Sequence, residues 1–338
     1  MSILFAGMKR DFLYPFTGTP ATWVSPATGN GIDAIYCDGG VEMTEDEKFQ
    51  RLNLQQTPVG VMWIKMNIWR AHPNSDSRLD GYWMTFKDAA GDSIARADSV
   101  DGKWRLEVYG DTTVTGPSIV QSASSNESDW TFKIDVTGSS ITVGWYVLGS
   151  LMTEVTSTNT TANRGVCTVI DWDLEDVMFE AIWDGYFRLS ELIITDGDED
   201  CRLWRCAHLP TTTAGNYSTF DSGDYSIVDD NDDTTSANSS VVGQKLSWNL
   251  DSLNAGVVVT NKDIAAVVHV SSGVSTGAAP AVTPFIRTAG TDYLGTKGSV
   301  TNENTHTQVW ALNPATSLAW TFSEINAGIE VGLQTATP

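Results

Sequence analysis

The sequence DWDLE carries three carboxylates at alternate positions, a spacing that suits the hydrolysis of glycosidic bonds. Asp171, Asp173 and Glu175 lie two residues apart from one another, so a β-strand would project all three from one face. Hydrolysis with retention of configuration needs two carboxyl groups roughly 5–5.5 Å apart, one as the nucleophile and one as the acid. The triplet is therefore the first candidate for catalysis in this chain.

This triplet is similar to the E-x-D-x-E strand of retaining glucanases that have a jelly-roll fold. Its first position is Asp171, one methylene shorter than the glutamate of that family, which puts the role of nucleophile in doubt. The simpler interpretation is a strand that packs one face on the core and turns its carboxylates toward water, a subunit or a bound cation. We therefore predict a chain that is not an enzyme and has no catalytic residue.

Two acidic stretches have the alternate spacing of a calcium-binding loop. Each lacks the glycine at the sixth position and the glutamate at the twelfth that an EF-hand requires, which excludes that helical motif. A looser calcium loop is one hypothesis, and ordinary acidic β-turns are the other. No cofactor other than calcium is suggested. The candidate calcium ligands are Asp196, Asp198, Asp200, Asp229 and Asp233.

The histidines and cysteines show no catalytic or metal-binding spacing. The 4 histidines stand far apart, and the 4 cysteines include no C-x-x-C pair. Cys201 and Cys206 flank RLWR, which we interpret as strand. Positions five apart on a strand lie on opposite faces, so we expect buried free thiols rather than a disulfide. The sequence also lacks a nucleophile elbow, a phosphate-binding loop and a dinucleotide fingerprint.

Tryptophan is the remaining candidate for contact with a ligand. The chain has 13 tryptophans, and several fall on expected strands, where lectin-like sandwiches stack sugar rings. Tryptophan is also the largest core-filling side chain, so packing is the alternative for each of them. The candidate glycan-binding residues are Trp69, Trp83, Trp104 and Trp145.

The elements that must position these residues are strands rather than helices. Segments such as Val59–Arg70 and Trp130–Val136 run apolar or alternate, and turns rich in Gly, Asp, Ser or Asn separate them. This pattern predicts a two-sheet sandwich. One short helical turn is expected within Thr316–Ala327. Its candidate caps are Thr321, Ser323 and Asn313.

The length of 338 residues exceeds what one hydrophobic core usually spans. We predict an all-β fold of two β-sandwich domains, residues 1–200 and a smaller one at residues 201–338, with the boundary placed within roughly ten residues. Near that boundary we expect Leu192–Thr195 to be a buried strand and Asp196–Asp200 its exit turn. Arg202–Leu209 would then begin the second domain.

The net charge of −22 at pH 7 limits the partners of the chain. Such a field repels phosphate backbones and anionic membranes, so we expect no nucleic-acid partner. The sequence has no run of eighteen apolar residues and no recognisable signal peptide, so we expect no membrane insertion and synthesis in the cytoplasm.

Two stretches resemble proteins of tailed-bacteriophage virions. In Tyr186–Leu250, a strand ending in SELIITD is followed by a Thr- and Gly-rich stretch with short acidic turns. Ala265–Gln334 resembles the closing half of the same proteins. The upstream strands look like a concanavalin A-like or laminin-G-like jelly roll. The matching pairs and triplets of the closing half are Asn313-Pro314, Ala319-Trp320-Thr321 and Ile325-Asn326.

This resemblance implies a non-enzymatic structural protein of the virion, a neck or tail fibre or another appendage, made in the host bacterial cytoplasm. Its expected partners are other neck, tail or capsid proteins and further copies of the chain, a trimer in the case of a fibre. The second domain would dock and the jelly roll would face outward. The alternatives are a capsid decoration protein and an adhesin that attaches to host surface glycans through the jelly roll.

Overall fold

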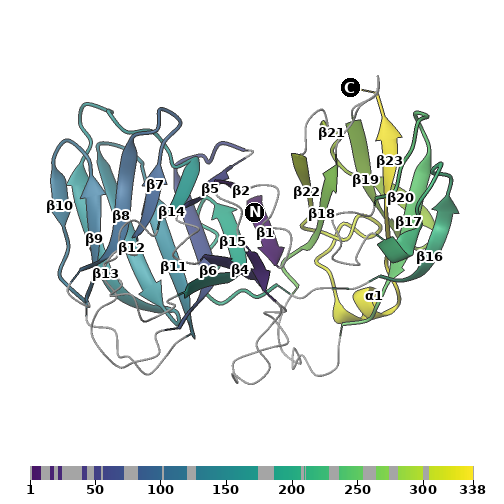
Figure 1. The fold of residues 1–338 in the computed structure, drawn as a ribbon, viewed down its shortest axis with the longest axis horizontal. Helices are drawn as coiled ribbons and strands as arrows, with labels where there is room; N and C mark the ends of the chain where they lie inside the picture. The colour runs from purple at the N-terminus through teal and green to yellow at the C-terminus, as the bar shows by residue number, and fades with distance from the viewer. Residues whose placement is uncertain are drawn as a thin grey trace. The chain divides into compact units, whose positions relative to one another are not determined.

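The computed structural model describes two units of antiparallel β-structure, Met1–Cys206 and Ala207–Pro338. Nearly all the elements in the described ranges are strands (Figure 1). None of the helices in those ranges has the length and apolar character needed to span a bilayer. The described residues are 2–8, 16–18, 22–24, 40–43, 49–54, 56–71, 83–100, 103–119, 127–173, 186–206, 209, 211–227, 236–253, 264–273, 281–299 and 304–337.

The first unit contains two sheets. Within the described residues one sheet has eight strands in the order β13-β12-β11-β6-β15-β4-β3, with β1 also paired to β15. These strands are β1 (Ser2–Met8), β3 (Thr22–Val24), β4 (Gly40–Met43), β6 (Val61–Ala71), β11 (Glu127–Asp135), β12 (Ser140–Val147), β13 (Ser150–Thr158) and β15 (Tyr186–Asp196).

The other sheet of the first unit has seven strands in the described residues, in the order β10-β9-β8-β7-β14-β5-β2. Strands that follow one another in sequence often lie in different sheets, so the chain crosses repeatedly between the two layers. The strands are β2 (Phe16–Gly18), β5 (Phe49–Asn53), β7 (Trp83–Lys87), β8 (Ser93–Val100), β9 (Lys103–Tyr109), β10 (Thr113–Thr115) and β14 (Val169–Asp173).

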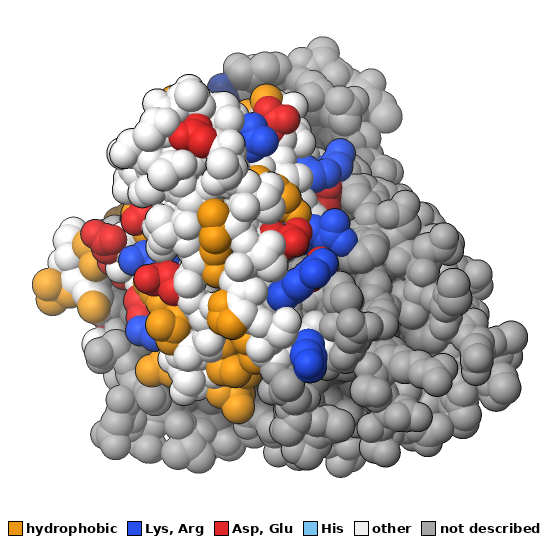
Figure 2. Space-filling model, turned by 90° about the vertical axis from the view of Figure 1, so that its left-hand side faces the viewer, with side chains coloured by type: hydrophobic (Ala, Val, Ile, Leu, Met, Phe, Trp, Pro, Cys, Tyr) orange, Lys and Arg blue, Asp and Glu red, His pale blue; other side chains and the backbone are white. Residues whose placement is uncertain are grey.

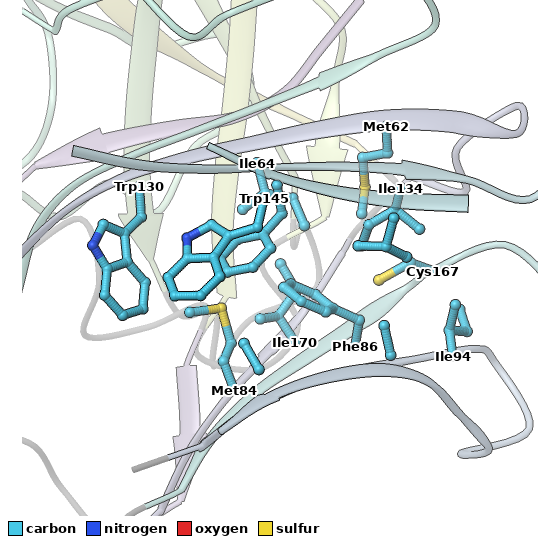
Figure 3. Close-up of a cluster of buried hydrophobic side chains, with 14 of the residues drawn as sticks. Met62, Ile64, Met84, Phe86, Ile94, Trp130, Ile134, Trp145, Cys167 and Ile170 are labelled. Carbon is cyan, nitrogen blue, oxygen red and sulfur yellow. The ribbon is translucent and has the colours of Figure 1, made fainter. Parts of the chain in front are cut away.

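The core of the first unit lies between these two sheets. Along β9, Trp104, Leu106 and Val108 are buried and alternate with more exposed residues, as expected for a strand with one face on the core. Figure 3 shows side chains from both sheets meeting in one layer, Trp145 from one side and Phe86 from the other. The predicted two-sheet jelly-roll sandwich is confirmed.

The second unit is a smaller sandwich. Its larger sheet has the order β16-β17-β23-β19-β20 with β21 paired to β19, and β18 and β22 form the facing pair. Leu246 and Trp248 of the larger sheet share a core with Val267 and Trp310 of the pair. The strands are β16 (Thr211–Ser218), β17 (Lys245–Leu250), β18 (Val267–Gly273), β19 (Ala281–Thr288), β20 (Thr291–Leu294), β21 (Gly298–Ser299), β22 (Asn304–Trp310) and β23 (Glu330–Ala336).

One short helix, α1 (Phe322–Asn326), precedes β23 in the second unit. Thr321 is its N-cap, and the Thr321 side chain accepts a hydrogen bond from the Glu324 amide. The Glu324 side chain accepts one from the Thr321 amide, which completes a capping box. The prediction of a helical turn capped by Thr321 is confirmed. A 3₁₀ turn at Tyr225–Ile227 is the other helical element of this unit in the described ranges.

The segment Cys201–Cys206, here called the strap, belongs to the first unit. Cys201 is fully buried and packs with Trp63, Tyr146 and Ile193 on the outer face of the eight-stranded sheet. The expectation that Arg202 begins the second domain is thus corrected, because the strap folds back onto β15's own sheet. The strap is also not the strand that we inferred for RLWR, since it turns through a hydrogen bond from the Trp204 amide to the Cys201 carbonyl at 3.0 Å.

Candidate functional site

Asp171 lies on β14 at the outer face of the seven-stranded sheet, held between two cations. Its carboxylate oxygens accept hydrogen bonds from Nε and Nη2 of Arg51 at 2.7 and 2.8 Å, and Nζ of Lys87 lies 2.7 Å from Oδ2. The side chain is 2% exposed. Burial by itself raises the pKa of Asp171, but the hydrogen bonds from Arg51 and Lys87 outweigh it and hold the pKa below its ordinary value.

This environment suits an anchor rather than a catalyst. A general acid at neutral pH needs a raised pKa, and a nucleophile needs an oxygen that is not already committed to cations. Asp173 closes β14, and neither its side chain nor Glu175 belongs to the described part of the chain. Of the predicted triplet, Asp171 alone is therefore placed, and its contacts are those of a structural ion pair.

The same arrangement recurs around Asp98 on β8, on the same face. Nε and Nη2 of Arg105 donate to its two oxygens at 2.8 and 3.0 Å, and Nε of Arg96 lies 3.7 Å from Oδ2. Thr85 stands in register with both Asp171 and Arg96, so the two groups are neighbours across the sheet. Figure 2 shows Lys and Arg side chains gathered in a column on the described surface of the first unit. This face combines two buried carboxylates with four half-buried cations.

The calcium candidates in the turn after β15 have other partners. Asp196 accepts a hydrogen bond from the Val59 amide at 2.9 Å, and Asp200 binds the Arg202 guanidinium through Nε and Nη2 at 2.8 and 2.6 Å. Within the described residues no cluster of three His, Cys, Asp or Glu side chains is arranged to hold a metal. Asp198 is exposed in the same turn, while Asp229 and Asp233 lie outside the described residues.

The placed glycan candidates belong to the core. Trp104 and Trp145 are 4% and 1% exposed, and their rings pack edge to face with 6.0 Å between centroids. Neither ring presents a face to a sugar, so for these two the alternative of packing replaces the glycan hypothesis. Trp69 and Trp83 lie on β6 and β7, and their side chains are outside the described part of the structure.

A buried cluster of charges, which we did not predict, lies on the outer face of the eight-stranded sheet. Lys65 on β6 is fully buried, pairs with Glu191 on β15 and lies 3.6 Å from a carboxylate oxygen of Asp129 on β11. Arg205 of the strap pairs with both carboxylates, and Nδ2 of Asn67 donates to Asp129 at 3.1 Å. Two cations and two anions thus compensate one another beneath the strap.

This cluster fixes the strap on the sheet. Burial raises the pKa of Asp129, but the hydrogen bond from Arg205 and the charge of Lys65 outweigh it, so the pKa lies below its ordinary value. The Cys206 amide donates to Glu191 as well. One signal in the sequence marks the site, because Lys65 and Glu191 each interrupt an apolar strand with a charge.

The thiols near these sites are unreactive. Cys167 and Cys201 are buried and free, and burial raises the pKa of each to about 12, so both stay protonated at neutral pH. The prediction of buried free thiols is confirmed for these two, while Cys206 is half-buried.

The larger sheet of the second unit carries its own polar cluster. Asp292 lies 2.7 Å from Nζ of Lys245, accepts a hydrogen bond from the Tyr217 hydroxyl at 2.8 Å and pairs with Arg287. Nε of Arg287 lies 3.7 Å from Glu330. Burial acts to raise the pKa of Asp292, yet the hydrogen bonds from Lys245, Arg287 and Tyr217 lower it overall. This cluster is again self-compensated.

His269 lies on β18, as expected for a strand residue, and faces the core of the second unit. Its ring meets Trp248 edge to face at 5.9 Å, and its Nδ1 has no hydrogen-bond partner among the residues that the structure describes. Burial, with a smaller contribution from the charge of His306, lowers the pKa of His269 to about 4. The ring is therefore neutral at pH 7, and no carboxylate of the described ranges is hydrogen-bonded to it to orient it as a base. His72 and His208 lie outside the described residues.

Comparison with known proteins identifies no family. No protein-family model matches the chain, and no curated protein matches it. Among solved structures, the botulinum neurotoxin type C whose cell entry depends on two ganglioside molecules is 9% identical with a TM-score of 0.41, covering 100% of this chain and 98% of that chain. The all-β fold stands on the strand pairing of the chain itself.

Two further solved structures are similar over about half of the chain. The binding domain of Paraclostridial Mosquitocidal Protein 1 is 10% identical with a TM-score of 0.39, and the match covers 59% of this chain and 50% of that chain. The CBM2 module of the evolved Dit of Lactobacillus casei BL23 phage J-1 is 10% identical with a TM-score of 0.35, and covers 59% of this chain and 98% of that chain.

Proposed function

We propose that this chain is a non-enzymatic structural protein of a tailed-bacteriophage virion, a neck or tail fibre or another appendage subunit. It would act through shape and contacts, with its sheets closed by backbone hydrogen bonds and its faces meeting neighbouring copies and proteins. The resemblance of Tyr186–Leu250 and Ala265–Gln334 to virion proteins is the reason for the virion assignment. No bound cofactor is needed for such a role.

The observation that carries the non-enzymatic part is the state of the buried carboxylates. Each one found in the described residues accepts hydrogen bonds or pairs with cations inside the protein. Glycoside hydrolysis by a carboxylate pair needs at least one carboxyl group whose proton or oxygen is open to the substrate. The buried carboxylates are Asp88, Asp98, Asp129, Asp171, Glu191, Asp196 and Glu330.

Labelling of intact particles tests the virion role. An antibody raised against the full chain is expected to bind the neck or tail of purified particles in electron micrographs. Labelling spread over the capsid would instead support the decoration alternative. An absence of the chain from purified particles, measured by mass spectrometry of their proteins, would overturn the proposal.

The adhesin alternative draws on one observation, the outer face of the seven-stranded sheet. Arg51, Lys87, Arg96 and Arg105 are 36%, 24%, 30% and 34% exposed, and buried carboxylates hold them in place. Preorganised cations of this kind suit the carboxylate of an acidic sugar. An array of neutral and acidic glycans, probed with the full chain and with Lys87→Gln, tests this role. If neither protein bound any glycan on the array, the adhesin alternative would be excluded and only the structural role would remain.

A further inference from the structure

Lys65 and Glu191 form a pair that is shielded from bulk solvent on the outer face of the eight-stranded sheet. Both side chains are 0% exposed, and Nζ of Lys65 contacts Oε2 of Glu191 directly. Strand β6 carries Lys65, and its two neighbours β15 and β11 carry Glu191 and Asp129. Arg205 of the strap pairs with both carboxylates. An amine and a carboxyl group are thus held in contact inside the protein.

An ion pair alone gives a poor account of this burial. Removing an ammonium and a carboxylate from water is unfavourable, and the attraction between the two ions often does no more than offset that loss. Joining the two groups as an amide would remove both charges from the interior. It would also replace a contact that can separate by a covalent bond between β6 and β15.

The surroundings of Glu191 are those of an acyl group prepared for attack by an amine. The Cys206 amide donates to Oε1, whereas Lys65 contacts Oε2. A backbone N–H directed at a carboxyl oxygen stabilises the negative charge that this oxygen gains when a nucleophile adds to the carbon. Atoms held about 3–3.5 Å apart react as if at very high concentration, and an amine in contact with a carboxyl oxygen is near this distance from the carboxyl carbon.

Asp129 is placed to move a proton during such an attack. Its Oδ1 lies 3.6 Å from Nζ of Lys65 and accepts a hydrogen bond from Nδ2 of Asn67 at 3.1 Å. Burial acts to raise the pKa of Asp129, but the hydrogen bond from Arg205 and the charge of Lys65 hold it below its ordinary value. A carboxylate that is kept ionised resists nucleophilic attack and accepts protons. Asp129 therefore suits the role of base, which leaves Glu191 as the acyl group.

We propose that Lys65 and Glu191 condense to an isopeptide bond in the folded protein. The ammonium gives one proton to Oε2, and the Nζ lone pair then forms a bond to Cδ. Asp129 takes a second proton from the attacking nitrogen and passes it to Oε2. The bond between Cδ and Oε2 breaks, and this oxygen leaves as water with both protons. The last proton of the ammonium stays on the amide, so the reaction needs no oxidant, reductant or cofactor.

The bond would strengthen the first unit where the chain leaves it. Strand β15 runs directly into the strap, and the second unit begins at Ala207. Tension on the chain beyond Cys206 therefore acts on β15, and a covalent bond to β6 transmits it to the middle of the sheet. The inference goes beyond the proposed function, because the same bond can form in a protein with any role.

Lys87 and Asp171 are a comparison pair within the same unit. Nζ of Lys87 lies 2.7 Å from Oδ2 of Asp171, but the lysine side chain is 24% exposed. Its ammonium keeps contact with water, and a hydrated ammonium must lose both its water and a proton before it can attack. We expect this pair to remain ionic, so the burial of Lys65 is the feature that separates the two sites.

The mass of the intact full chain tests the proposal. After the folded protein has been kept warm for several days, mass spectrometry of the denatured chain should find it lighter than its sequence by one water. Digestion should release a branched peptide in which Lys65 is joined to Glu191. Asp129→Asn keeps both reacting residues and should slow the loss of water about a hundredfold, the usual contribution of a general base.

The control is the double variant Lys65→Met with Glu191→Leu. It lacks both reacting groups, leaves neither charge of the pair buried alone and should keep its full sequence mass under the same treatment. A wild-type chain that keeps its full sequence mass would overturn the proposal. A bond at Asp129 or at Asp171, or an unchanged rate in Asp129→Asn, would contradict it as well. Particle labelling judges the virion role separately.

Discussion

Asp171 has the residue type and spacing of a catalytic carboxylate, yet its surroundings are those of an anchor. Its partner Arg51 lies on a neighbouring strand, 120 residues away in sequence. Local spacing correctly indicated that Asp171 leaves the core face of β14. It could not indicate that cations already occupy both oxygens, because that depends on the order of strands across the sheet.

Replacing Asp171 by Asn should destabilise the protein. The change leaves Arg51 and Lys87 beside a neutral amide at a site 2% exposed. We expect a loss of about 2 kcal/mol in the free energy of unfolding, since the cations are themselves half-exposed and partly solvated. Urea unfolding followed by tryptophan fluorescence measures it.

Asp92→Asn is the control for this prediction. Asp92 is 57% exposed and 3.9 Å from Arg164, so its loss should change the free energy of unfolding by no more than about 0.5 kcal/mol. Equal effects of Asp171→Asn and Asp92→Asn would contradict the assignment of Asp171 as an anchor.

At the scale of elements, strands were predictable where one face is buried and the other is exposed to solvent. β9 alternates as the sequence indicated, whereas β17 in the second unit has three consecutive buried residues. The strap was not predictable, because RLWR has the composition of a strand and its fold-back depends on Lys65, Asp129 and Glu191 from three separate strands. The conformation of the strap is therefore determined by ion pairs with residues distant in sequence rather than by its local strand propensity.

The pair beneath the strap should show strong coupling between its members. Glu191→Gln alone leaves the positive charge of Lys65 buried without the carboxylate that pairs with it. Lys65→Met alone likewise leaves the negative charge of Glu191 buried without its lysine. Each should cost about 3–5 kcal/mol in the free energy of unfolding, whereas the double variant should cost clearly less than the sum. Additive losses in this double-mutant cycle, measured by urea unfolding, would show that the pair does not hold the sheet and strap together.

β18 should make the second unit sensitive to mild acid through His269. The pKa of His269 is about 4 in the folded state and about 6.5 in an unfolded chain. Above pH 6.5 both states are neutral and the residue has no effect. As pH falls from 6.5 toward 4 the unfolded state gains a proton that the folded state does not, so stability falls, by about 3 kcal/mol in all.

His269→Phe removes this titration and keeps a ring beside Trp248. Amide hydrogen exchange of β18, measured at pH 7 and pH 5, should show a loss of protection in the wild type that is smaller in the variant. His306→Gln removes only the smaller contribution to the low pKa of His269, so in this variant the acid sensitivity should persist and be only slightly reduced. The same acid sensitivity in wild type and His269→Phe would exclude His269 as the cause.

At the scale of the whole molecule, both units carry an excess of acids. Residues 1–206 hold 16 Lys and Arg against 30 Asp and Glu, and residues 207–338 hold 4 against 12. Both units are thus net negative, by 14 and 8, although their buried carboxylates are paired. Each unit thus carries more acids than cations, and this net negative charge repels other negatively charged molecules.

Salt should therefore stabilise this protein. Screening weakens the repulsion among like surface charges more than it weakens ion pairs that are buried, such as Lys65 with Glu191. Between about 0.01 M and 0.15 M sodium chloride, where the screening length falls from roughly 30 to 8 Å, we expect Tm to rise. Calorimetry at the two salt concentrations measures this shift. If salt instead lowered Tm, attraction between surface charges would outweigh the repulsion that a net charge of −22 implies.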